Sequence, residues 1–223
     1  MATSTVEDYL KCIYQAEGRL EGEGDLVSTG QIATTLKVAP GTATAMMKTL
    51  ADSGLISYEP YSGVRLTPEG ARVAAHVLRR HRVIELFLVE VLGMSWSEVH
   101  SDAELLEHAV SDRLLDRMYE MLGRPLVDPH GDPIPSARGV LKEKDYPSLL
   151  QCPPGASVRV ARVTDQTPDF LRLLERHGIM PGNRIEVESR EEAAETVLIR
   201  TGGGGSLSLG HRAAASVLVD PRA

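Results

Sequence analysis

The stretch from Ser97 to Leu122, SEVHSDAELLEHAVSDRLLDRMYEML, constrains the chain most strongly. Read as one helix, in which each residue turns by about 100°, it gathers acidic and imidazole side chains on one face: His100, Glu104, Glu107 and His108. The opposite side carries the predicted core stripe, which consists of Leu106, Ala109 and Val110. Divalent Mn, Fe and Zn ions accept such mixed oxygen and nitrogen donors. A solvated charged face is the alternative interpretation.

Two further segments carry side chains of the same kind. His81 and Glu85 stand four residues apart, so they share one face of a preceding helix. Asp8 opens the first predicted helix of the chain. Potential ligands on three helices favour a composite metal site over an exposed charged surface.

Composition limits the class of protein. The 223 residues suffice for one large or two modest domains, and 42% of them are hydrophobic but only 4% aromatic. The start, MATSTVEDYL, has no secretory signal, and no apolar run approaches the ~20 residues of a membrane span. Cys12 and Cys152 form no ligand-spaced pair, which suits a reducing cytoplasm. The net charge of −7 disfavours indiscriminate coating of nucleic acid but allows a specific, conditional DNA binder.

The first seventy residues predict a winged helix-turn-helix. A helix over 6–17 is followed by two short helices, 29–36 and 42–53, which are joined at Pro40-Gly41 and ended by Gly54. Two short strands, 55–58 and 64–67, flank a turn that contains Pro60 and Ser62-Gly63. This order of elements predicts a domain that binds double-stranded DNA.

The second short helix is expected to enter the major groove by its N-terminal end. Small and polar residues occupy this end, and the candidate contacts are Ala39, Pro40, Gly41, Thr42, Thr44 and Lys48. Arg65 on the wing is a candidate phosphate contact. Because long base-reading side chains are missing, phosphate contacts and DNA shape should contribute much of the recognition. Packing or protein contact is the alternative role for this motif.

The remainder divides into three parts. A long helix from Thr67-Pro68-Glu69 to about Leu92 is typical of a dimerisation element, and half-site recognition also favours a two-fold homodimer. Residues 122–154 predict an irregular connection, in which His130 and Asp132 are interpreted as turn residues. From Gly155 several short strands and one helix, 168–177, predict a small closed barrel.

These segments together resemble the diphtheria-toxin-repressor family of metal-dependent repressors. The resemblance rests on VEDYLKCIY, the winged helix ending LISYEPYSGVRLTPEG, RRHRVIELFL, EVHSDAELLEHAVSD, DPHGDPIP and the terminal strands. It implies a mainly α fold with β structure: a winged helix-turn-helix (1–70), a helical metal-binding and dimerisation domain (71–140), a linker (141–154), and an SH3-like or FeoA-like barrel (155–223).

The resemblance also implies two metal ions per subunit. The primary site would comprise Asp8, Glu104, Glu107 and His108. The ancillary site would comprise His81, Glu85 and His100, completed by Asp165 or Gln166. Acids at Asp8 and Glu104, where the iron sensors of the family carry sulfur, favour Mn²⁺, with Fe²⁺ as the second choice.

Two residues near Asp8 qualify this ligand set. Lys11 stands where some manganese sensors of the family have an acid, and a charged lysine cannot ligate a metal. It is expected to pair with Asp8 or to neutralise the site. Cys12 is interpreted as a small buried hydrophobe.

The sequence therefore predicts a non-enzymatic repressor that binds operator DNA as a homodimer when Mn²⁺ or Fe²⁺ is bound and controls metal-uptake genes. Two alternatives remain at this point. One is a metal-independent winged-helix regulator whose barrel binds an organic ligand. The other is a metallohydrolase that uses Glu107 as a base, against which stands the lack of a nucleophile constellation or a phosphate loop.

Overall fold

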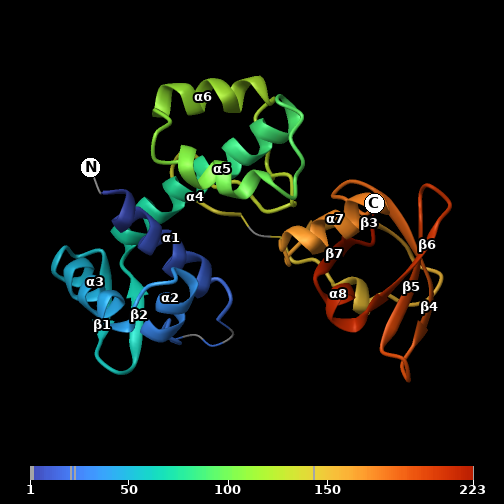
Figure 1. The fold of residues 1–223 in the computed structure, drawn as a ribbon, viewed down its shortest axis with the longest axis horizontal. Helices are drawn as coiled ribbons and strands as arrows, with labels where there is room; N and C mark the ends of the chain where they lie inside the picture. Colours follow the sequence, from blue (N-terminus) through green and yellow to red (C-terminus); the bar gives the residue numbers. More distant parts are fainter. Residues whose placement is uncertain (1–2, 21, 23, 143, 223) are drawn as a thin grey trace. The chain divides into compact units, whose positions relative to one another are not determined.

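The structure, a computed structural model, describes residues 3–20, 22, 24–142 and 144–222. Figure 1 shows the chain coloured along the sequence. Its contacts divide it into two compact units. Unit 1 comprises residues 1–81, 107–109 and 135–141, and unit 2 comprises residues 82–106, 110–134 and 142–223. The three-residue segment 107–109 therefore packs with the N-terminal unit, although the helices on both sides of it belong to unit 2.

Unit 1 contains the predicted helix-turn-helix. α1 (Ser4–Glu17) begins where the Thr3 hydroxyl accepts a hydrogen bond from the amide of Val6, as an N-cap does. α2 (Thr29–Thr35) is capped by Ser28, and α3 (Pro40–Asp52) starts at a proline, which suits a first helical turn. Gly54 follows α3 with φ +71°, the left-handed conformation predicted for it. The core consists of buried residues from these helices and the wing, including Leu10, Ile13, Ile32, Met47, Leu50 and Val64.

The wing is a two-stranded hairpin. β1 (Ile56–Glu59) pairs antiparallel with β2 (Gly63–Leu66), with Ile56 opposite Leu66 and Glu59 opposite Gly63. β1 lies beside α3, as Figure 1 shows. The predicted winged helix is thus present, and its strand limits differ from the expected ones by a single residue.

α4 (Pro68–Glu90) matches the predicted long helix, but the predicted helix over 97–122 is wrong. The structure has α5 (Val99–Leu106) and α6 (Asp112–Met121), and α6 starts anew because the Ser111 hydroxyl caps it by accepting from the amide of Leu114. The predicted core stripe also fails, since Leu106 is 37% exposed and Ala109 is exposed, whereas Val99 and Ala103 are buried.

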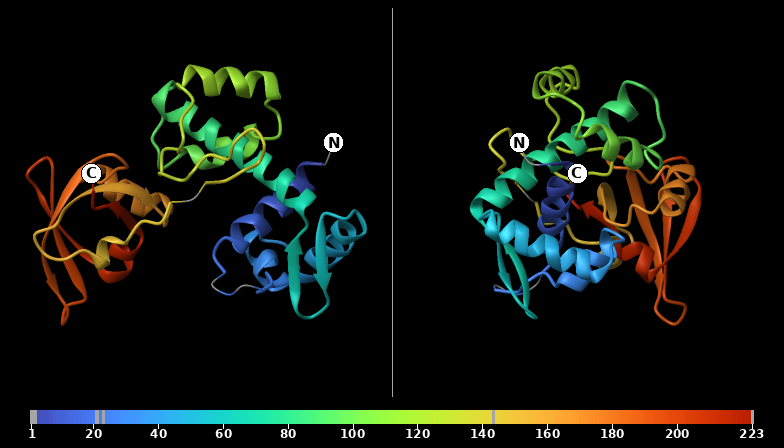
Figure 2. Two further views of the ribbon diagram at one scale, coloured as in Figure 1. Left: turned by 180° about the vertical axis from the view of Figure 1, so that it is seen from behind. Right: turned by 60° about the vertical axis from the view of Figure 1, so that its left-hand side comes forward.

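The C-terminal strands form one antiparallel sheet in the order β6-β5-β4-β3-β7. Its strands are β3 (Ser157–Val163), β4 (Arg184–Glu191), β5 (Thr196–Thr201), β6 (Ser206–Gly210) and β7 (Val217–Asp220). Register shifts interrupt the β3–β7 and β4–β5 pairings, and Figure 2 shows the sheet coiling strongly. Within the described residues no β6–β7 pairing closes it, so the hydrogen bonds define a curved sheet where a closed barrel was predicted.

Short helices accompany this sheet. α7 (Pro168–Arg176) confirms the predicted helix, while α8 (His211–Ala215) and the 3-10 turn Leu149–Gln151 are too short for a periodic pattern to predict. The core beneath the sheet is mainly aliphatic, and it also contains Cys152 and the buried Trp96 contributed by the segment before α5. Residues 122–142 and 144–148 are irregular, as expected. Among the described helices, none is both long and apolar enough to cross a bilayer.

Candidate metal centres and DNA-binding surface

Asp8, Glu107 and His108 converge in unit 1. Each offers one ligand atom, and these atoms all lie within 4.8 Å of one another. Asp8 projects from α1, whereas Glu107 and His108 follow the end of α5. Three of the four residues predicted for the primary site are therefore brought together from positions about one hundred residues apart.

His108 joins two carboxylates of α1. Its Nδ1 lies 2.8 Å from Oε2 of Glu7, and its Nε2 lies 2.8 Å from Oδ1 of Asp8. Because ionised carboxylates only accept hydrogen bonds, both ring nitrogens donate and the ring is an imidazolium. Partial burial opposes this charge, but the bonds to Glu7 and Asp8 and the nearby Glu107 outweigh it and raise the pKa of His108. Sequence reasoning missed Glu7, which stands beside the predicted Asp8.

This raised pKa gives the metal-free protein a pH dependence. A histidine whose folded-state pKa is raised contributes its full stabilisation below the ordinary value near 6.5 and loses it as pH rises through the folded-state value. We expect the melting temperature of chelator-treated protein to fall between pH 6 and pH 8 by more in the wild type than in His108→Gln. If the melting temperatures of the two proteins changed equally with pH, the raised pKa would not belong to His108.

Glu107 is fully buried between two basic side chains. Lys11 donates to its Oε1 at 2.5 Å, and His81 donates from Nδ1 to its Oε2 at 2.6 Å. Oε1 also lies 3.5 Å from Nε2 of His108. The sequence-based expectation that Lys11 would neutralise the site agrees with this pairing, although the partner is Glu107.

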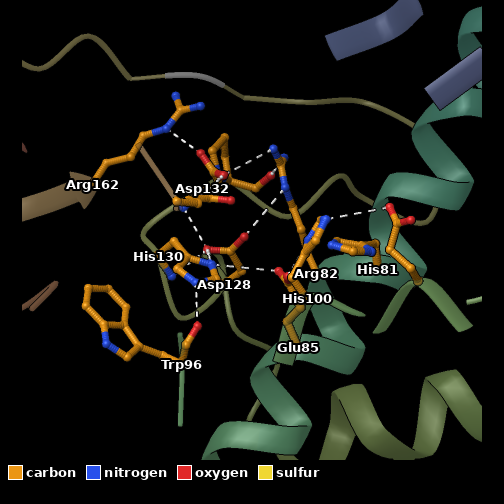
Figure 3. Close-up of polar contacts among 12 residues, drawn as sticks. His81, Arg82, Glu85, Trp96, His100, Asp128, His130, Asp132 and Arg162 are labelled. Carbon is orange, nitrogen blue, oxygen red and sulfur yellow. Dashed lines mark hydrogen bonds and ion pairs between the residues drawn. The ribbon is translucent and has the colours of Figure 1, made fainter. Parts of the chain in front are cut away.

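A second group of potential ligands lies in unit 2 and comprises Glu85, Asp128 and His130. Figure 3 shows Glu85 on α4 close to Asp128 and His130 of the loop 128–132. All three are at most 4% exposed. Nε2 of His130 donates to the carbonyl of Trp96 at 2.9 Å, so in a neutral ring Nδ1 carries the lone pair. Nδ1 is buried without a hydrogen-bond partner and faces Glu85 Oε2 at 3.8 Å and Asp128 Oδ1 at 4.0 Å.

This arrangement fits a cation. The Nδ1 lone pair of His130 is buried without a hydrogen-bond partner and is directed at two carboxylates, and an ion placed among the three groups would take Nδ1 and a carboxylate oxygen of each acid as ligands. The hydrogen bond from the far side of the ring to a backbone carbonyl is the usual support of a metal-ligating histidine. His130 was interpreted from the sequence as a turn residue, because its burial is not visible in a proline-rich segment.

Asp128 organises the loop that holds this group. Its Oδ1 accepts from the amides of His130 at 2.8 Å and Asp132 at 2.9 Å, and Arg82 lies 3.7 Å from its Oδ2. Burial, followed by repulsion from Asp132 and Glu85, raises the pKa of Asp128 well above its usual range. A nearby cation would relieve that repulsion.

Of the other predicted ligands, His100 and Glu85, which the resemblance assigns to one ancillary site, lie together, whereas Asp165 and Gln166 contact residues outside the predicted ligand set. Glu104 lies on α5 in unit 2, half exposed, with Oε1 3.8 Å from His100, and His100 also lies 3.3 Å from Glu85. Asp165 accepts from the amide of Thr167, and Gln166 donates to Asp132 at 2.9 Å. Arg162 on β3 pairs with the same Asp132 (Figure 3).

Neither cysteine joins these groups. Cys12 and Cys152 are free thiols, 6% and 4% exposed, and burial raises the pKa of each. Cys12 packs in the unit 1 core, which confirms that it is a small buried hydrophobe.

The predicted DNA-contacting residues all lie in unit 1, on α3, on the residue before it and on the wing. Ala39, Pro40, Gly41, Thr42, Lys48 and Arg65 are exposed, and Thr44 is half-buried. The Thr44 hydroxyl donates to the Pro40 carbonyl, and Arg65 donates to the Asp25 carbonyl. A groove of about 430 Å³ separates α3 from the wing and is lined by Ser28, Thr29, Thr44, Lys48, Tyr58 and Tyr61. Hydroxyl groups and a lysine along a groove suit a sugar-phosphate backbone.

Comparison with known proteins covers nearly the whole chain. Residues 1–64 match the N-terminal DNA-binding domain of iron dependent repressors, residues 67–136 match their metal binding and dimerisation domain, and residues 148–221 match the FeoA domain. The iron-dependent repressor IdeR of Mycobacterium leprae is 30% identical over 97% of this chain and 96% of its own length. The diphtheria toxin repressor of Corynebacterium diphtheriae is 27% identical over 84% and 85%.

Solved structures agree with these relatives. A manganese-dependent transcriptional repressor in complex with manganese is 40% identical, with a TM-score of 0.84 over 96% of this chain and 98% of that one. ScaR with bound Zn²⁺ is 32% identical, with a TM-score of 0.76 over 96% and 98%. The chain therefore belongs to the iron-dependent, or diphtheria-toxin, repressor family of metal-dependent transcriptional repressors.

Proposed function

We propose that this repressor senses Mn²⁺, with Fe²⁺ as the alternative corepressor, and controls metal-uptake genes. The convergence of Asp8, Glu107 and His108 carries the proposal, because the three donors are oxygen and nitrogen without sulfur. The manganese complex of a 40% identical repressor supports the same choice of metal. Glu104 is proposed as a further ligand of this primary ion.

A second ion per subunit is proposed in unit 2. Glu85, which the sequence analysis placed in an ancillary site, would hold it together with Asp128 and His130. His100, 3.3 Å from Glu85, lies beside this group, and Asp165 and Gln166 of the C-terminal domain remain candidates to complete it. The orphaned Nδ1 of buried His130 supports this assignment.

A bound cation would supply positive charge to a region crowded with carboxylates. Without that charge, Asp8 pairs with His108, Glu7 pairs with His108 and Arg80, and Glu107 pairs with Lys11 and His81. Asp8 stands on the first helix of the DNA-binding domain, so the ligands that hold it also position that domain. If the metal binds the DNA-competent state more tightly than the other state, it increases the population of the DNA-competent state by the ratio of the two affinities.

The partner in DNA binding is proposed to be a second copy of the chain. Large apolar side chains are exposed around α5 and α6: Leu105, Leu106, Leu114 and Met121. The matched family model describes residues 67–136 as a dimerisation domain, which supports a homodimer on a two-fold operator. We propose the same division into 1–70, 71–140, 141–154 and 155–223 as above, and a cytoplasmic location with the operator DNA.

A mobility-shift titration tests the function. A DNA duplex selected from a random pool by the wild type in Mn²⁺ is titrated with protein in Mn²⁺ and in chelator. We expect at least tenfold tighter binding with Mn²⁺, within the usual 5–150-fold range of about 1–3 kcal/mol of allosteric coupling. Equal affinity in chelator would instead favour a metal-independent regulator.

Lys48 is expected to contact phosphate, because it is exposed on α3 beside the groove. Lys48→Ala should weaken binding to all duplexes similarly and lower the slope of log K against log salt by about 1. Fluorescence anisotropy across a salt series measures both quantities. Arg113, exposed on α6, provides a matched control, and Arg113→Ala should leave the slope unchanged. A loss confined to one DNA sequence would assign Lys48 to base recognition.

A further inference from the structure

The buried ion pair between Lys11 and Glu107 occupies an oxygen that the candidate primary site needs. Lys11 is 6% exposed and Glu107 is fully buried, so water screens neither charge. The lysine donates to Oε1, which is also the Glu107 oxygen 3.5 Å from Nε2 of His108. The other oxygen, Oε2, is bonded to His81. In this state both oxygens of Glu107 already have partners.

We propose that Lys11 is an internal competitor of the metal, which sets the affinity of the primary site. The ammonium group holds Glu107 in place when no metal is bound. An incoming divalent ion must share Oε1 with this ammonium or displace it, and the two positive charges repel each other. Lys11 therefore stabilises the metal-free protein and weakens metal binding at the same time.

The two effects arise from one contact. Without Lys11, Glu107 would keep its bond to His81 but lose the positive charge at Oε1, and the loss of a charged partner destabilises a buried carboxylate. The negative charge that is no longer neutralised at Oε1 is what attracts a cation to the site. This inference rests on the proposed metal function, because it concerns ions bound by Glu107.

Lys11→Met provides the test, since methionine keeps much of the length and apolar volume of the side chain but has no charge. Compared with the wild type, we expect a lower melting temperature in chelator, and a Kd for Mn²⁺ that is about tenfold tighter or more, since a like charge has been removed at short range. The increase in melting temperature on adding Mn²⁺ should be larger than in the wild type. Competition with a chelating indicator dye measures the Kd, and calorimetry measures the melting temperatures.

Two further variants define the origin of the effect. Lys11→Arg keeps the charge and should bind Mn²⁺ as the wild type does. Lys11→Gln keeps a hydrogen-bond donor for Oε1 without the charge, so it should also bind Mn²⁺ more tightly, and it serves if Lys11→Met does not fold without metal. In an Asp8→Ala background, which removes another ligand, Lys11→Met should bring little or no gain.

Replacing Lys11 by an uncharged residue should lower the stability of the metal-free protein but increase the affinity for Mn²⁺. A lysine with a merely structural role would, when replaced, lower both the stability and the affinity for Mn²⁺. An unchanged or weaker Kd in both Lys11→Met and Lys11→Gln would overturn the inference. Absence of Mn²⁺ and Fe²⁺ binding by the wild type would instead refute the proposed function itself.

Discussion

Glu107→Ala should abolish the metal response of operator binding and destabilise the metal-free protein. The substitution removes a donor of the candidate primary site and leaves Lys11, 6% exposed, with its ammonium group deprived of a buried partner. Breaking a buried ion pair in this way costs about 3–5 kcal/mol. Denaturant unfolding in chelator measures the loss, and mobility shifts with and without Mn²⁺ measure the response.

Two controls separate these effects. Glu107→Gln keeps the volume and one oxygen for Lys11, so it should recover part of the stability while still losing the metal response. Asp116→Ala removes an exposed carboxylate of α6 and should change neither quantity. If Glu107→Ala retains the full difference between Mn²⁺ and chelator, Glu107 does not bind the activating ion.

Asp128→Ala should have the second largest effect, because one carboxylate orders the loop that carries His130. The variant loses two hydrogen bonds from buried backbone amides to a carboxylate, and bonds to charged groups contribute about 1.5–3 kcal/mol each. We therefore expect about 3 kcal/mol or more of destabilisation, together with loss of the second bound ion. Unfolding curves and equilibrium dialysis with Mn²⁺ measure the two losses.

Asp128→Asn separates loop order from ligation. Its side-chain oxygen still accepts from the two amides, and the substitution removes a charge that Asp132 and Glu85 repel. This variant should unfold close to the wild type in chelator yet bind one ion fewer. The same number of ions in wild type and Asp128→Asn would assign the second ion to other residues.

The domain order was predictable because each element has a local signal. The cap at Ser28, the proline at the start of α3 and the glycine after it fix the two short helices within a few residues of sequence, whereas α1 begins at Ser4, two residues before its predicted start. The break between α5 and α6 was not predicted, because apolar and charged residues continue in helical spacing across it. Only the burial of Glu107 shows that the side chain points into the protein at the break.

The candidate sites were predictable only in part, because the type of a side chain is visible in the sequence but its distant contacts are not. Asp8, Glu107 and His108 were recognised by their chemical type and by the resemblance to a family. Glu7 and His130 were missed as ligands or partners because their roles depend on contacts with residues far away in the sequence, such as His108 and Trp96. Side-chain burial, which decides whether a histidine is a turn residue or a potential ligand, follows from tertiary packing.

The two buried thiols have a chemical consequence. The thiolate is the form that attacks peroxide, and burial disfavours that form at both Cys12 and Cys152. The groups that converge at the candidate metal centres are carboxylates and imidazoles, which undergo no reversible oxidation of the kind that converts cysteine to a sulfenic acid. Reversible oxidation of a ligand thiol is therefore not available at these centres as a means of regulation.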